Sequence, residues 1–157
     1  MKSKLISALV ALGFLAASAM ATTTNDLTGA GSGALPAGLK TPVVMSGTAS
    51  FTTTAAGALD VYKVIIIPSN SVVKDLWYKI VSTNASAAVV HIGDSTLSNR
   101  YATAVDMQGV AGTCAFADSV GTFTNRQYTS KDYIAVKAAG AITAGSIQVK
   151  AVIVPFE

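Results

Sequence analysis

The feature that most constrains this chain is a series of short, β-branched apolar segments separated by turn residues. The last of them, Ser146–Pro155, alternates apolar and polar residues, as a strand does when one of its faces is buried. An earlier pair, Val61–Ile67 and Val72–Val81, is divided by the turn sequence Pro68–Ser71. These segments predict strands joined by tight turns and give little support to long helices.

Three further segments extend this pattern along the chain. They are Pro42–Phe51, where Gly47 interrupts the predicted strand, Ala87–Ile92 and Tyr133–Lys137. Seven or eight strands with turns at regular intervals are typical of a sandwich. The sequence therefore predicts an all-β fold, an antiparallel β-sandwich with jelly-roll-like topology.

Strict alternation assigns the residues of Val72–Val81 to two faces of a sheet. One face carries Val72, Leu76, Tyr78 and Ile80, and the other carries Val73, Asp75, Trp77, Lys79 and Val81. The second face mixes apolar and charged residues, so we expect that side of the sheet to be only partly buried.

The N-terminal segment 1–21 has the three parts of a secretory signal in their usual order. Lys2 and Lys4 precede an apolar run, and Ala19-Met20-Ala21 fits the small-x-small cleavage pattern. The apolar run is shorter than the roughly 20 residues of a comfortable membrane span. Translation from Met20 would give nearly the same product as cleavage, so both histories remain open.

Residues 22–40 are rich in Gly, Thr and Ala and show no hydrophobic period. Such a segment cannot build a core of its own, so we expect a flexible arm. The sandwich domain then occupies residues 41–157. With 51% hydrophobic and 12% charged residues in 157, the chain has room for one domain with a full core.

Charge argues against a nucleic-acid partner. Beyond the leader the chain carries nine basic and eight acidic residues, and the basic ones are scattered singly. Binding to phosphates needs clustered cations that release counterions, so nucleic acid is a poor candidate.

Residues that could support catalysis or metal binding are scarce. The only histidine, His91, lies mid-strand on the face opposite Val90 and Ile92, where a lone histidine is usually structural or exposed. The only cysteine, Cys114, has no basic neighbour, so we expect a small buried apolar side chain. The sequence therefore predicts no enzyme, no catalytic residue and no zinc site.

Two weaker ligand hypotheses remain. Asp94 and Asp106 could hold calcium together with turn carbonyls, although an aspartate at a turn usually caps its own backbone. The aromatic residues could form a sugar platform, but a place in the core or in a subunit contact is the favoured interpretation. These residues are Trp77, Tyr78, Tyr101, Phe116, Phe123, Tyr128 and Tyr133.

A set of turns and strands in this chain resembles small virion proteins of tailed phages that decorate or cement the capsid. The stretches that carry the likeness are Asp60–Val73, Ile80–Thr83, Val90–Ser95, Arg100–Tyr101, Lys131–Ile134 and Gly145–Val152. The resemblance implies a jelly-roll-like sandwich, self-association as a dimer or trimer, and contacts with the major capsid protein across its joints. The leader departs from this pattern, because capsids normally assemble in the cytoplasm.

Our leading hypothesis is accordingly a capsid decoration subunit on the virion surface, without a cofactor or small-molecule substrate. The alternative is an exported subunit of a bacterial surface or extracellular fibre, whose arm adds a strand to the next subunit. The segments expected to make the contacts are the arm, Thr22–Lys40, and the least regular stretch, Thr96–Ser130.

Overall fold

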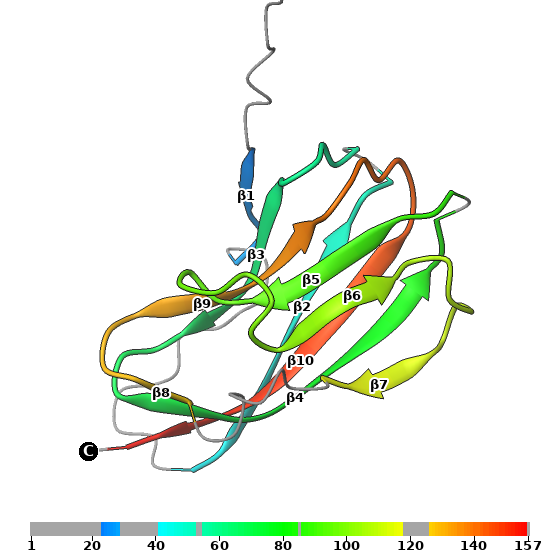
Figure 1. The fold of residues 1–157 in the computed structure, drawn as a ribbon. Helices are drawn as coiled ribbons and strands as arrows, with labels where there is room; N and C mark the ends of the chain where they lie inside the picture. The colour runs from blue at the N-terminus through cyan, green and yellow to red at the C-terminus, as the bar shows by residue number, and fades with distance from the viewer. Residues whose placement is uncertain (1–22, 29–40, 53–54, 85, 118–125, 157) are drawn as a thin grey trace, which may run out of the picture.

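The computed structural model describes residues 23–28, 41–52, 55–84, 86–117 and 126–156, and this part of the chain contains ten strands and no helix (Figure 1). The strands are β1 (Thr24–Asp26), β2 (Val43–Ser50), β3 (Val61–Ile67), β4 (Ser71–Ser82), β5 (Val89–Gly93), β6 (Ala102–Asp106), β7 (Cys114–Phe116), β8 (Arg126–Tyr128), β9 (Asp132–Ala138) and β10 (Ser146–Pro155). Within these described ranges there is accordingly no helix long and apolar enough to cross a bilayer.

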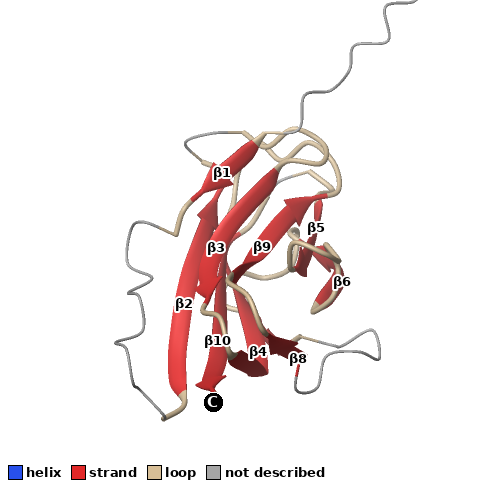
Figure 2. Ribbon diagram, turned by 90° about the vertical axis from the view of Figure 1, so that its left-hand side faces the viewer, coloured by secondary structure: helices blue, strands red, loops and turns tan. Residues whose placement is uncertain are grey.

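The strands form two sheets that pack face to face (Figure 2). One sheet has the order β2-β10-β4-β7, with β8 also paired to β4, and the other has the order β1-β3-β9-β5-β6. Every pair among β2 to β10 is antiparallel, and the chain changes sheet between most consecutive strands. Apart from β1, this order is that of a jelly roll, which confirms the predicted fold class.

The six strands that the sequence pattern located are all present, and the described part of the chain has ten strands where the sequence predicted seven or eight. β3 and β10 have the predicted bounds, and β2, β4, β5 and β9 begin and end within two residues of them. Local pattern was sufficient for these strands because each contains β-branched residues and is bounded by turn residues. The least regular stretch holds three further short strands, β6, β7 and β8, and residues 118–125 within it lie outside the described part.

The predicted faces of β4 are wrong at Val73. Pairing with β10 shifts by one residue here, since Asp75 lies opposite Val152 while Val73 lies opposite Ile153. Lys74 is the extra residue of a β-bulge, and it reverses the alternation beyond it. Val73 is therefore fully buried in the core, although strict alternation placed it on the same face as Asp75.

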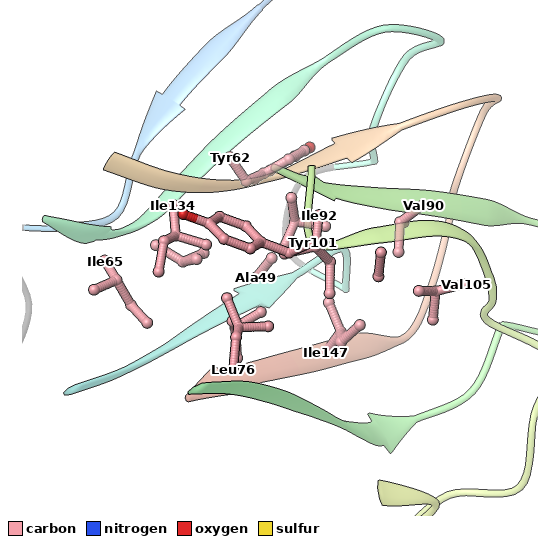
Figure 3. Packing of buried hydrophobic residues seen from close by; sticks show 14 of the residues in the cluster. Ala49, Tyr62, Ile65, Leu76, Val90, Ile92, Tyr101, Val105, Ile134 and Ile147 are labelled. Atoms are coloured by element: carbon pink, nitrogen blue, oxygen red, sulfur yellow. The ribbon is translucent and has the colours of Figure 1, made fainter. Parts of the chain in front are cut away.

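Apolar side chains from the two sheets fill the space between them (Figure 3). Leu76 and Ile147 come from one sheet, and Val90, Ile92 and Ile134 from the other. All five are at most 1% exposed, and burying such a side chain contributes about 1.5 to 3 kcal/mol. This core holds the strands whose outer faces and edges are available to partners.

Gly47 does not interrupt β2, contrary to expectation. The strand runs through it, with Gly47 paired to Val149 of β10. A Cβ atom here would lie 2.0 Å from the carbonyl oxygen of Val64, so only glycine lets β2 and β3 approach this closely. The glycine therefore determines how closely the two sheets approach each other at this point.

The predicted arm is partly a strand. Residues Thr24–Asp26 form β1, which runs parallel to β3 at the edge of its sheet. Residues 23–28 of the expected flexible arm thus include a short strand. The leader, residues 1–21, and arm residues 22 and 29–40 lie outside the described part.

Candidate interaction surface

The least regular stretch of the sequence forms one edge of a sheet, where apolar side chains face outward. β7 pairs with β4 so that Phe116 lies opposite Trp77 and Cys114 opposite Lys79. Directly opposed residues of an antiparallel pair share one face of the sheet. Leu76 of β4 lies on the core face, so Trp77 and its partner Phe116 point away from the core.

These two side chains, together with the neighbouring Cys114 and Ala115, form an apolar surface that we call the β7 patch. They line a shallow hollow of about 380 Å³. Phe116 is 78% exposed, which is unusual because a side chain with such a large apolar area is normally buried. A large exposed apolar group beside a half-buried tryptophan indicates a contact surface.

Cys114 lies in this patch, which corrects its predicted burial. The thiol is exposed, and its Sγ donates a hydrogen bond to the carbonyl oxygen of Gly112 at 3.4 Å. The absence of charged neighbours in the sequence suggested a core position. Cys114 is exposed because β7 is an edge strand and because its side chain lies on the outer face of the sheet. Neither fact can be read from the three consecutive apolar residues Cys114–Phe116.

A buried polar network anchors the same stretch to the core. Asp94 is 4% exposed and follows β5 directly. Its Oδ1 accepts hydrogen bonds from the backbone N–H of Thr96 at 2.9 Å and of Leu97 at 2.8 Å. Its Oδ2 accepts from Arg100 Nε and from the Tyr128 hydroxyl, the latter at 2.8 Å. One carboxylate thus joins the loop after β5 to β8 of the opposite sheet.

The electrostatics of this network favour a fixed protonation state. Burial alone would raise the pKa of Asp94, but the hydrogen bonds from Leu97, Tyr128 and Arg100 together lower it. Burial raises the pKa of Tyr128 and of Tyr101, whose hydroxyl groups contact each other. Asp94 therefore stays ionised and both phenols stay protonated at neutral pH. The network is suited to holding strands together.

The turn-capping interpretation of the two aspartates is confirmed. Asp94 caps the turn at Thr96 and Leu97, and Asp106 Oδ1 accepts a hydrogen bond from the Gln108 N–H at 2.8 Å. Across the described ranges, no three His, Cys, Asp or Glu side chains converge in a way that could hold a metal ion.

His91 lies where the sequence placed it, on the outer face of β5. Val90 and Ile92 on either side are fully buried, and His91 Nδ1 accepts a hydrogen bond from the Ala104 N–H at 3.1 Å. The imidazole thus helps to hold β6, a structural role.

The aromatic residues divide between core and surface. Tyr101 and Tyr128 are buried, and Tyr78 packs against the core. Trp77 and Phe116 belong to the β7 patch, while Phe123 lies outside the described residues. This division agrees with the favoured interpretation of core or subunit contact.

A second hollow, of about 300 Å³, lies beside β1, β3 and β9. Its lining is mixed in charge, with Lys63, Lys131, Asp26 and Asp132 among its residues. Lys63 Nζ lies 4.5 Å from the centre of the Tyr133 ring. Two cations and two carboxylates give this lining no net charge.

The fold is similar to chains of solved phage capsids, whereas no protein-family model and no curated sequence matches the chain. The first is from the capsid of Ralstonia phage GP4, with a TM-score of 0.62 and 15% identity over 86% of this chain and 99% of that chain. The second is from the capsid of cyanophage Pam1, with a TM-score of 0.59 and 19% identity over 73% and 85%. A third is from the capsid of Helicobacter pylori bacteriophage KHP30, with a TM-score of 0.50 and 18% identity over 75% and 94%. At these identities, the likeness establishes the fold.

Proposed function

We propose that this protein is a virion structural protein, a decoration subunit that binds the outer surface of a phage head. The observation that carries the proposal is the match between this jelly roll and nearly whole chains from phage capsids. Because each match covers most of the other chain, those chains are themselves about the size of this single domain. A small sandwich used as a complete capsid component is what a decoration subunit requires.

The surface chemistry supports attachment to another protein. The β7 patch presents Phe116 and Trp77 on one sheet edge, and exposed aromatics are enriched at protein interfaces. One such patch makes a modest interface, but many copies on a shell add their contacts through avidity. The partner that this proposal assigns is the major capsid protein of the shell.

A structural role also agrees with the residues that carry the buried network. Asp94 is engaged by Arg100, by Tyr128 and by two backbone N–H groups, as a carboxylate with a structural role would be. His91 is engaged with the backbone of β6. We therefore assign no reaction to the protein.

The test is to purify phage particles from the source culture by density and to measure the intact mass of this protein within them. We expect the protein to be present in many copies per particle. A chain that starts at Ala21 would identify Met20 as the translation start, and one that starts at Thr22 would identify an exported protein that still joins the particle.

Absence from particles would overturn the proposal. If a chain starting at Thr22 were then found in the periplasm or medium, the exported fibre subunit would become the better assignment. A matched control is the major capsid protein itself, which must be detected in the same preparation.

A further inference from the structure

The docking of β1 differs from every other strand pairing in the described part of this protein. β1 lies parallel to β3, with Thr24 opposite Val61 and Asp26 opposite Lys63 (Figure 2). The Val61 N–H donates to the carbonyl oxygen of Thr23 at 2.9 Å, and the Leu27 N–H donates to that of Lys63 at 2.9 Å. A segment that precedes the sandwich thus completes one edge of its sheet.

Asp60 provides a prepared acceptor for this added strand. Its side chain is only 7% exposed, and its Oδ1 accepts the Thr23 N–H at 2.7 Å. Its Oδ2 accepts the Gly57 N–H at 2.7 Å, which fixes the carboxylate from within the sandwich. A buried carboxylate that is held in a fixed orientation just before β3 can bind the backbone N–H of a strand that is added at this edge.

The strand itself contributes nothing to the core. Thr24 and Asp26 are exposed, Asn25 is half-buried, and Leu27 is 38% exposed. β1 is therefore held mainly by backbone hydrogen bonds and by Asp60. Backbone bonds of this kind are the same whichever copy of the chain supplies the strand.

The connection to the sandwich is long enough to reach a neighbour. Residues 29–40 separate β1 from the first residues of the domain, and twelve extended residues span at most roughly 40 Å. A domain of this length is about 35 Å across, by the usual scaling of size with chain length. The maximal span of the connection thus exceeds the width of the domain, so its length does not restrict β1 to its own sandwich.

We propose that the β3 edge and Asp60 form a receptor that, in the assembled state, takes β1 from a second copy of this chain. Exchange of one strand between identical copies costs little, because the hydrogen bonds broken within one copy are formed again with the second copy. An edge that always receives a strand is also protected from wrong pairing. The inference holds for a shell or for a fibre, so it does not depend on the proposed function.

The test uses disulfides between separately labelled copies of the full chain, in a Cys114→Ser background. One population carries Thr24→Cys and the other carries Val61→Cys, the residues that face each other in the register. Paired strands bring Cα atoms into the range that a disulfide requires. After the two populations are refolded together and oxidised, we expect a covalent heterodimer on a non-reducing gel.

The matched control replaces Val61→Cys by Val44→Cys, because Val44 is 60% exposed and lies on β2 of the other sheet. This pair should give at least tenfold less heterodimer. Adding Asp60→Asn to the Val61→Cys copy should reduce the heterodimer severalfold, because the amide can no longer accept from both Thr23 and Gly57.

Placing Thr24→Cys and Val61→Cys in one chain reports docking within a copy. If this chain forms only a cross-linked monomer and the mixed populations give no heterodimer above the control, the exchange proposal is wrong. A failure to cross-link in both arrangements would overturn it too, since β1 would then not dock at this edge at all.

Discussion

At the scale of the residue, Asp94 is the side chain on which the irregular stretch depends. It caps the loop after β5 and bonds to Arg100 and Tyr128, which are remote from each other in sequence. A buried carboxylate of this kind is stable only while its partners are in place. The loop between β5 and β6 is therefore held rigidly against β8.

We predict that Asp94→Asn lowers the free energy of unfolding by about 3 kcal/mol at pH 7, because Arg100 would be left as a buried cation without its counter-charge. Urea denaturation measures the change. The control is Asp106→Asn, which affects one exposed hydrogen bond to Gln108 and should cost less than about 1 kcal/mol. Equal effects of the two substitutions would contradict the role given to Asp94.

The same comparison has a defined pH dependence. The pKa of Asp94 is lowered in the folded state, so its ionisation stabilises the fold fully above the unfolded value of 3.8. This contribution is lost as pH falls below 3.8 through the folded pKa. The difference in stability between wild type and Asp94→Asn should therefore be constant from pH 7 to about 5 and shrink below pH 4. A difference that grows on acidification would contradict this sign.

At the scale of the element, edge position determines what each strand can do. β4 is paired on both sides, with β10 on one and with β7 and β8 on the other, and its inner face is core. β7 has a partner on one side only among the described residues, and it carries the exposed Phe116. A short edge strand limits sheet-to-sheet aggregation while it offers side chains to a specific partner.

We predict that Phe116→Ala weakens binding to phage heads about tenfold or more, since it removes a large apolar contact from the β7 patch. Folding should be unaffected because the side chain is 78% exposed. Sedimentation of the purified variant with undecorated heads measures binding. Val44→Ala on β2, 60% exposed at the other edge of the same sheet, is the control and should bind like wild type. Unchanged binding by Phe116→Ala would remove the β7 patch from the interface.

At the scale of the whole molecule, the protein combines a rigid sandwich with an N-terminal segment that docks on its edge. The sandwich is complete without β1, because the eight-stranded jelly-roll order is formed by the later strands. The arm adds backbone bonds at one edge, and the β7 patch lies at an edge of the other sheet. Two sheet edges are thus available for two kinds of contact.

We predict that deleting residues 22–40 leaves the sandwich folded but weakens its attachment to heads. β1 buries no core side chain, so the melting temperature should fall by only a few degrees. Binding should fall at least severalfold, because links between neighbouring copies through the arm would be lost. Circular dichroism and co-sedimentation check the two parts. Unchanged binding would show that the arm makes no contact in the assembly.

Much of the strand pattern was predictable from sequence, and the candidate surface was predictable only in outline. The stretch Thr96–Ser130 was expected to make contacts because it lacked a regular pattern, and it does contain Phe116 of the β7 patch. The pattern did not identify the strands within it, since β7 and β8 are three residues each. Strands this short carry too few residues for a period to be detected.

The sequence by itself determined the all-β class and the bounds of strands such as β3 and β10, because alternation and β-branching are local properties of neighbouring residues. Tertiary structure alone decided the burial of Val73, the exposure of Cys114, the bonds of Asp94 and the docking of β1. Each of these depends on register and on which strand lies alongside. Register and strand order are set by contacts between residues far apart in the chain, and a local sequence pattern carries no information about such contacts.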